Sequence, residues 1–223
     1  MSGLYVDSLT KDFGVRKVLT DVFITCVKGD IIGLLGRNGS GKSTLLKIIF
    51  GSLKADHKYI KVDETHINSL SDSRKLMHYL PQDNFLPTHI TIGKIITLFC
   101  APEKAAILHE KEQIKPFLNN KSNELSGGER RLIEILIILY SKSKYILLDE
   151  PFNGLAPLHI EIIKEQIRVI AIEKGIIISD HDYVNVLDLS TSLLLLHEGA
   201  IKKIKEHQEL VHFGYLPASS LAT

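Results

Sequence analysis

A short glycine-rich segment, residues 36–44, restricts the fold of this chain more than any other feature. It reads Gly-Arg-Asn-Gly-Ser-Gly-Lys-Ser-Thr and matches the pattern GxxxxGK[ST]. The segment follows an apolar run, residues 30–35, and precedes a stretch, residues 42–50, whose apolar residues recur at helical spacing. The order of strand, glycine loop and helix places backbone N–H groups and a helix N-terminus around a phosphate. The segment therefore predicts a nucleotide site in an α/β fold.

Two residues of this loop carry specific tasks. Lys42 is expected to reach the β- and γ-phosphates of ATP, and the Ser43 hydroxyl is expected to ligate Mg²⁺. A glycine turn that only caps a helix is the alternative, and the strand and helix around the loop argue against it. The predicted ATP-binding residues of the loop are Gly36, Arg37, Asn38, Gly39, Ser40, Gly41, Lys42, Ser43 and Thr44.

Further along the chain, two apolar runs predict a parallel sheet. Residues 144–148 and 175–179 are nearly continuous β-prone runs, which is typical of strands buried on both faces. Between them, from Pro157 to Lys174, isoleucines recur three or four residues apart, and proline suits a first helical position. This order predicts a strand–helix–strand crossover.

The first of these strands is followed by two adjacent acids, Asp149 and Glu150. Ligands of open α/β sheets gather at the carboxyl ends of the strands. Asp149 is therefore expected to contact Mg²⁺, directly or through water, and Glu150 is expected to polarise a water molecule for attack on the γ-phosphate. A solvated strand end would explain the acids on their own, but not together with the phosphate loop.

Between the loop and the acids lies Leu-Ser-Gly-Gly-Glu, residues 125–129, directly before an apolar stretch, residues 131–140, that predicts a helix. At this point the chain resembles the ABC ATPase family. The likeness extends from about residue 4 to about residue 210. The family's motifs occur in the family's order: Phe13, the phosphate loop, Gln82, residues 125–129, the acid pair and His181.

The resemblance implies roles for three further residues. Phe13 is expected to stack on adenine, although an ordinary core phenylalanine is the alternative. Gln82 is expected to touch Mg²⁺ and the attacking water. His181 is expected to hydrogen-bond the γ-phosphate in the transition state. With Glu150, Gln82 and His181 form the predicted catalytic set, and Ser43, Gln82 and Asp149 the predicted magnesium set.

The resemblance also implies that the site is shared between two copies of the chain. In this family the signature residues, here Ser126, Gly127 and Gly128, face the ATP bound to the phosphate loop of a partner. Two copies are thus expected to close over two Mg-ATP. A single copy is expected to hydrolyse ATP poorly.

The family fold implied is a P-loop NTPase core of the α/β class, with a mostly parallel sheet and an N-terminal antiparallel β part. A small helical subdomain is inserted in it. For this chain we expect one ABC ATPase domain whose core is formed by residues 1–82 and 126–212, with the helical insertion at about 83–125 and a tail at 213–223.

The chain departs from many members at two places. Ala156 stands where many members have aspartate in the loop that crosses the dimer interface, and the segment from Gln82 to Ser126 is shorter than usual. The sequence Gly-Leu-Ala-Pro at residues 154–157 resembles that of the ATPases of branched-chain amino-acid importers. The sequences Glu-Arg-Arg at residues 129–131 and Asp-Glu-Pro-Phe at residues 149–152 resemble those of the ATPases of lipopolysaccharide export.

Charge and the distribution of apolar residues limit which partners the chain is expected to have. The formal net charge is +1 and the basic residues are scattered, so no nucleic-acid partner is expected. No segment approaches the apolar length of a membrane span, and the first residues do not resemble an export signal. We therefore expect a cytoplasmic ATPase, peripheral on the inner face of the membrane, that serves separate transmembrane transporter subunits.

Three other functions are compatible with a phosphate loop. A soluble ABC ATPase, for example of the iron–sulfur cluster assembly type, remains the main alternative, and its partner would be a soluble scaffold. A module that binds ATP without hydrolysing it has no use for the acids and His181. A P-loop kinase or GTPase would explain Lys42 but not residues 125–129.

Overall fold

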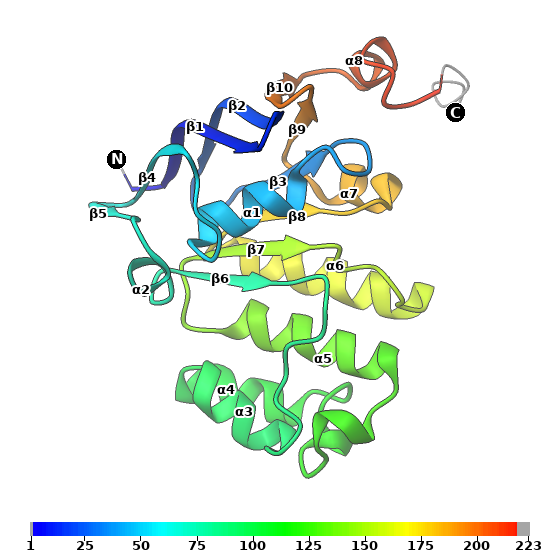
Figure 1. Cartoon of the computed structure of the whole chain (residues 1–223). Coiled ribbons are helices and arrows are strands. Elements are labelled where there is room, and N and C mark those ends of the chain that lie inside the picture. The colour runs from blue at the N-terminus through cyan, green and yellow to red at the C-terminus, as the bar shows by residue number, and fades with distance from the viewer. Residues whose placement is uncertain (1, 218–223) are drawn as a thin grey trace.

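The computed structural model describes residues 2–217 and contains two sheets with helices around them (Figure 1). The larger sheet has six strands in the order β10-β9-β3-β8-β7-β6, and the smaller has four in the order β2-β1-β4-β5. The strands are β1 Leu4–Phe13, β2 Arg16–Cys26, β3 Ile31–Leu35, β4 His57–Val62, β5 Thr65–His66, β6 Met77–Leu80, β7 Tyr145–Asp149, β8 Gly175–Ser179, β9 Ser192–His197 and β10 Ala200–Ile204.

The larger sheet is parallel except at one edge. Strands β9, β3, β8, β7 and β6 run parallel, and β10 pairs antiparallel with β9. The smaller sheet is antiparallel throughout. These findings confirm the predicted fold class, a mostly parallel sheet with an N-terminal antiparallel part.

The helices cover both faces of the larger sheet. They are α1 Lys42–Phe50, α2 Leu70–Ser73, α3 Ile92–Phe99, α4 Pro102–Glu110, α5 Gly127–Tyr140, α6 Pro157–Ala171, α7 Tyr183–Leu189 and α8 His207–His212, with short 3₁₀ turns η1 Lys115–Phe117 and η2 Ser122–Glu124. None of the helices in the described part of the chain has the length and apolar character needed to cross a lipid bilayer.

Two hydrophobic cores lie on opposite faces of the larger sheet. Within β7, Ile146 and Leu148 pack into the core under α5 and α6, whereas Tyr145 and Leu147 pack into the core that holds α1 and the smaller sheet. This alternation follows from the two-residue period of a strand. Both faces are therefore buried, which explains the nearly continuous apolar run in the sequence.

Two helix limits differ from the sequence prediction. The helix predicted from residue 157 to 174 ends at Ala171, because the N–H of Lys174 bonds back to the carbonyls of Ile170 and Ala171 before the chain enters β8. The helix predicted from residue 131 begins at Gly127, because Ser126 caps it. Apolar periodicity marks the buried part of a helix and not its polar ends.

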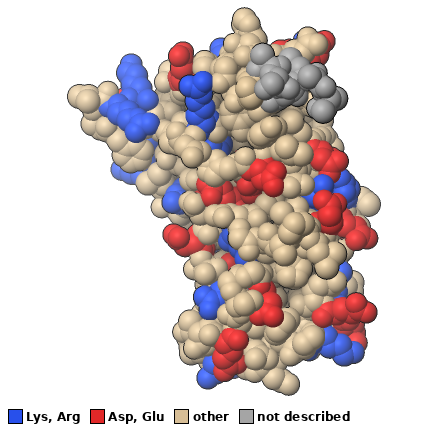
Figure 2. Space-filling model, turned by 90° about the vertical axis from the view of Figure 1, so that its right-hand side faces the viewer, with Lys and Arg blue, Asp and Glu red and all other residues tan. Residues whose placement is uncertain are grey.

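Short helices fill the segment for which a helical insertion is predicted. Helices α3 and α4 with η1 and η2 lie beside α5, at the end of the molecule opposite the smaller sheet (Figure 1). We keep the division into a core and a helical subdomain at about residues 83–125 as a proposal. On the face seen in Figure 2, basic and acidic side chains are interspersed rather than separated into two regions.

The predicted tail, residues 213–223, is described only as far as residue 217. Within it, the N–H groups of Tyr215 and Leu216 bond to the carbonyl of Leu210, and Leu216 is buried. These residues therefore pack against α8. Residues 218–223 lie outside the described residues.

One half-buried histidine on β6, His78, should make stability depend on pH. Burial, and then the charge of Lys174, lower the pKa of His78 to about 4, and its Nδ1 has no hydrogen-bond partner among the described residues. In the unfolded chain, His78 binds a proton at the ordinary histidine pKa of about 6.5. The contribution of His78 to stability is therefore complete above about pH 6.5 and is lost as the pH falls toward 4. The loss should reach up to about 3 kcal/mol. Urea unfolding from pH 8 to 4 should show a shallower decline for His78→Gln, whereas His207→Gln, at an exposed site, should keep the wild-type slope.

Candidate functional site

The phosphate loop connects β3 to α1 in a conformation that needs glycine. Gly41 precedes α1 with φ of 108°, in the left-handed region that L side chains rarely adopt, and a Cβ there would lie 2.7 Å from Cγ1 of Val18. A Cβ on Gly36 would lie 2.9 Å from the carbonyl oxygen of Leu196. The backbone can therefore wrap closely only because these side chains are absent.

Lys42 is buried inside this loop. Its Nζ donates to the carbonyl oxygens of Gly36 at 2.6 Å and Arg37 at 3.2 Å. Burial lowers the pKa of Lys42, and the negative charges of Glu150 and Asp149 oppose that shift. A positive charge is thus concentrated at the centre of the loop, where a phosphate group would be attracted.

Asp149, at the end of β7, faces the first turn of α1. Its Oδ1 accepts from Oγ of Ser43 at 3.0 Å, and its Oδ2 accepts from the hydroxyl of Tyr79 at 2.8 Å. Burial raises the pKa of Asp149, and these two hydrogen bonds limit the rise. A carboxylate and a hydroxyl oxygen are the donors that Mg²⁺ prefers, so this pair fits a magnesium site. Tyr79 was not predicted, although its place near the end of β6 points to it.

Glu150 brings the predicted catalytic residues together. Its Oε2 accepts from Nε2 of Gln82 at 2.8 Å, and its Oε1 lies 2.7 Å from Nε2 of His181. The backbone of Glu150 has φ of 49°, which is unusual for a residue with a side chain, and its N–H donates to the carbonyl of Ser179 at 2.6 Å. Backbone strain of this kind concentrates at functional sites.

A cavity of about 500 Å³ joins these groups to the phosphate loop. It is lined by Phe13, Arg16, Val18, Asn38, Gly39, Ser40, Gly41, Lys42, Ser43, Thr44, Gln82, Glu150 and His181.

Phe13 is half-exposed at the cavity wall, with Nζ of Lys11 5.1 Å from its ring centroid, so it is not a core residue. Arg16 donates to the carbonyl of Gly39 at 2.9 Å, and it belongs to no motif that would identify it from the sequence. Gly36, Arg37 and Asp149 are not among the lining residues. The Arg37 side chain turns away and donates to the carbonyl of Gly214 at 2.7 Å.

The signature residues lie at the N-terminus of α5 and not in this cavity. Ser126 caps the helix, accepting from the N–H of Glu129 at 3.3 Å, and the carboxylate of Glu129 accepts from the N–H of Ser126 at 2.8 Å. Ser126 and Gly127 are exposed and Gly128 is half-buried. Within one chain, Ser126 is thus engaged with Glu129, and none of the three residues lines the cavity.

Arg131 on α5 links the backbone of Asp149 and Glu150 to the backbone of Pro81, which precedes Gln82. Its guanidinium donates to the carbonyls of Pro81 at 2.8 Å, Asp149 at 2.9 Å and Glu150 at 2.8 Å. It also lies 3.5 Å from the carboxylate of Glu134, which is fully buried. Sequence reasoning noted this arginine only as part of a family wording and assigned it no role.

The departure at residue 156 leaves a helix without a side-chain cap. Ala156 is the N-cap of α6, with Pro157 at the first helical position. Ala156→Asp should supply the missing acceptor and stabilise the fold by about 1 kcal/mol in urea unfolding. Ala101 caps α4 in the same way, also before a proline, so Ala101→Asp is a matched control with a gain of similar size. A loss of stability on Ala156→Asp alone would show that the loop before α6 does not tolerate a carboxylate.

The mixed sheet with its phosphate loop defines a nucleotide-binding protein of the P-loop class, and comparisons with known proteins narrow the class. Residues 19–153 match the family described as ABC transporter. The lipopolysaccharide export system ATP-binding protein LptB of Haemophilus influenzae is 34% identical over 90% of this chain and 89% of its own length.

Two solved structures share the fold. One, described as an ATP-binding subunit of an ABC transporter, superposes with a TM-score of 0.84 at 24% identity, over 97% of this chain and 95% of its own. The other, a nucleotide-free ATP-binding cassette from an ABC transporter, has a TM-score of 0.78 at 26% identity, over 97% and 96%. The chain belongs to the ABC transporter family, in the class of its ATP-hydrolysing, ATP-binding subunits.

Proposed function

We propose that two copies of this chain bind two Mg-ATP between them, hydrolyse the ATP and power separate transmembrane transporter subunits from the cytoplasmic side. The observation that carries the proposal is the convergence of Gln82 and His181 on Glu150, across one cavity from Lys42. A base, two groups that orient it and a phosphate cradle are the parts that phosphoryl transfer to water requires.

The roles follow from the positions of the side chains. Glu150 accepts the proton of the attacking water, and Gln82 and His181 hold its two carboxylate oxygens in place until a γ-phosphate is present. Lys42 exchanges its contacts with loop carbonyls for phosphate oxygens. His181 then stabilises the charge that develops on the γ-phosphate. Phe13 provides an exposed ring for adenine.

Magnesium would be held by Ser43 and Asp149, with Gln82 nearby. When bound, the ion neutralises charge on the β- and γ-phosphates. Tyr79 orients Asp149 by its hydrogen bond, so that the other carboxylate oxygen faces Ser43.

A second copy is proposed because one chain leaves its signature residues outside its own cavity. Ser126, Gly127 and Gly128 lie at the N-terminus of α5, where Ser126 and Gly127 are exposed, and a helix N-terminus suits an anion. In a head-to-tail pair, that terminus would meet the γ-phosphate on the partner's loop. The relative LptB is named as part of an export system, and we propose a membrane partner for this chain by the same division of labour.

Complementation between two inactive variants tests the shared site. Lys42→Ala removes the phosphate contact, and Gly128→Asp places a carboxylate where the partner's γ-phosphate is expected. A Cβ on Gly128 would lie 3.6 Å from the carbonyl oxygen of Gly154, an ordinary contact, so the backbone of the single chain has room for the first carbon of a side chain. Each variant alone should be inactive. An equal mixture should recover about one quarter of the wild-type ATPase rate, because half of the randomly paired dimers hold one intact site.

Three measurements accompany the mixture. The wild-type rate per chain should rise with protein concentration, the Lys42→Ala variant should bind ATP more weakly, and Gly128→Asp should keep its wild-type unfolding midpoint. A mixture that stays as inactive as its components, while the wild type is active, would refute the arrangement in trans.

A further inference from the structure

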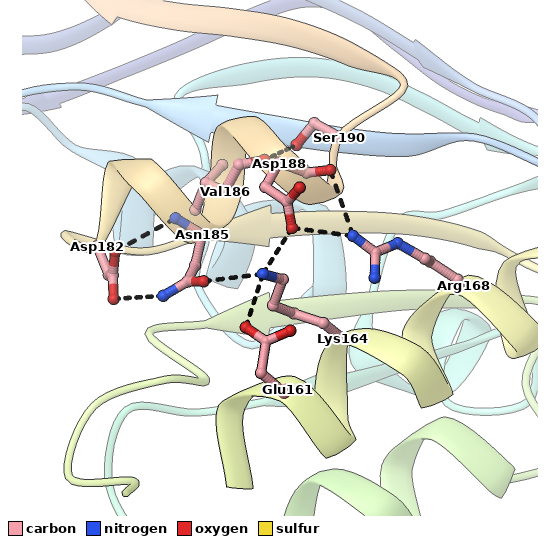
Figure 3. Close-up of polar contacts among 8 residues, drawn as sticks. All are labelled: Glu161, Lys164, Arg168, Asp182, Asn185, Val186, Asp188 and Ser190. Atoms are coloured by element: carbon pink, nitrogen blue, oxygen red, sulfur yellow. Dashed lines mark hydrogen bonds and ion pairs between the residues drawn. The ribbon is translucent and has the colours of Figure 1, made fainter. Parts of the chain in front are cut away.

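Lys164 on α6 is a buried lysine that lies outside the cavity. Its side chain is 7% exposed, and its Nζ contacts Oδ2 of Asp188 at 2.5 Å, Oε1 of Glu161 at 2.9 Å and Oδ1 of Asn185 at 3.1 Å (Figure 3). Burial disfavours the charged form, but the carboxylates of Asp188 and Glu161 more than offset it and raise the pKa of Lys164. The ammonium is therefore charged and joins α6 to α7.

The contact with Asn185 continues toward the predicted site. Nδ2 of Asn185 donates to Oδ2 of Asp182 at 2.7 Å, and its backbone N–H donates to Oδ1 of the same residue at 3.3 Å (Figure 3). Asp182 is the N-cap of α7 and directly follows His181. The series of contacts that begins at Lys164 thus reaches the residue next to the histidine.

The residue that precedes His181, Asp180, also holds the turn in place by hydrogen bonds. Asp180 is buried, and its carboxylate accepts from the N–H of Asp182 at 2.9 Å and from the N–H of Phe152 at 2.8 Å. Phe152 is two residues beyond Glu150. The turn that carries His181 is therefore tied at both ends, to α6 through Lys164 and to the Glu150 segment through Asp180.

The His181 side chain depends on this turn for its position. It is 46% exposed, and its Nε2 lies 2.7 Å from Oε1 of Glu150. A half-exposed ring has few neighbours to fix its orientation, so the backbone that carries it must do so. Displacement of that backbone would change the distance between His181 and Glu150.

A second cation on α6 separates this role from simple helix packing. Nη2 of Arg168 binds the same Oδ2 of Asp188, at 2.9 Å, and also holds α6 against α7 (Figure 3). Arg168 contacts only Asp188, near the end of α7, among the residues of that helix that the structure describes. Lys164 contacts Asp188 and also Asn185, which lies near the beginning of α7. The two residues share a partner but differ in their connection to His181.

We propose that Lys164 is a positioning residue for ATP hydrolysis, which acts through Asn185 and Asp182 to keep His181 in contact with Glu150. The inference rests on the proposed function, because that function gives His181 its task at the γ-phosphate. Lys164 does not line the cavity, so it acts only through other residues.

The first test needs no nucleotide and no activity. Imidazole signals of His181 are recorded by NMR in the full chain, with His181→Ala used to assign them, and Lys164→Met is compared with Arg168→Met. Methionine keeps the apolar stem and removes the ammonium. The His181 signals should shift in Lys164→Met and stay at their wild-type positions in Arg168→Met. Unchanged signals in Lys164→Met, or equal shifts in both variants, would overturn the proposal.

The second test is steady-state ATPase kinetics of the same variants. Lys164→Met should lower kcat by about ten-fold or more with KM for ATP unchanged, because misplacement of a catalytic group costs rate rather than ground-state binding. Arg168→Met should stay within about two-fold of wild type. Normal kcat in Lys164→Met would overturn the catalytic consequence. An inactive wild type would refute the proposed function instead, and the NMR comparison would still decide the positioning.

A variant that leaves all charges in place guards against misfolding. Asn185→Ala removes the bridge between Lys164 and Asp182 but leaves Lys164 paired with Asp188 and Glu161. Its His181 signals should shift as in Lys164→Met, with wild-type unfolding. Wild-type His181 signals in a folded Asn185→Ala protein would count against the route through Asn185.

Discussion

Glu150→Gln should abolish turnover while leaving ATP binding intact. Glutamine has the size of glutamate and can still accept from Gln82, but it cannot take a proton from water. We expect kcat to fall about 10²- to 10⁴-fold, the usual contribution of a general base. Affinity for ATP should stay within a few-fold, because neither Lys42 nor the loop is altered. Size-exclusion chromatography with ATP should then show a dimer that persists.

The matched control is Glu165→Gln, the same chemical change at an exposed position on α6. It should keep the wild-type rate and the wild-type elution volume. A Glu150→Gln protein that turns over normally would remove Glu150 from its assigned role. If the Glu150→Gln protein is inactive but stays monomeric with bound ATP, Glu150 keeps its role as the base. That result would contradict the proposal that two nucleotides hold a dimer together.

The parts of the site that sequence reasoning found are those formed by neighbours in the chain. The phosphate loop, the acid pair after β7 and the signature before α5 each span a few residues, so their residue types and order predict the local structure. The fold class followed from the same motifs together with apolar runs buried on both faces of the sheet. Their roles in catalysis remain predictions.

Residues that act through distant partners were missed. The guanidinium of Arg131 reaches Pro81, which is 50 positions away in the chain, and Tyr79 reaches Asp149 over 70 positions. Arg37 shows the reverse case: the motif places it in the loop, but its side chain binds Gly214, 177 positions away. Neither periodicity nor a motif encodes which side chains meet across elements, because tertiary packing decides it.

Arg131→Met should cause the largest loss of stability of any single change proposed for this chain. The substitution leaves the carboxylate of Glu134 fully buried without its cation. Among the described residues, it then keeps hydrogen bonds only from the N–H groups of Phe85 and Leu86. Breaking a buried ion pair costs about 3–5 kcal/mol, because an uncompensated charge remains. Urea unfolding should show this loss, and ATPase activity should fall with it, because the carbonyls of Asp149 and Glu150 lose their donor.

Its neighbour Arg130 supplies the control. Within residues 2–217, Arg130 donates through Nε to a single carbonyl, that of Ser122 at 2.7 Å, and it is only half-buried. Arg130→Met should cost about 1 kcal/mol, the net value of one hydrogen bond. Adding Glu134→Gln to Arg131→Met should recover part of the loss, because it removes the stranded charge while the amide oxygen can still accept from Phe85. If Arg131→Met cost no more than Arg130→Met, the link from α5 to the Glu150 segment would be dispensable, and the rigidity of the site would have to come from the sheet alone.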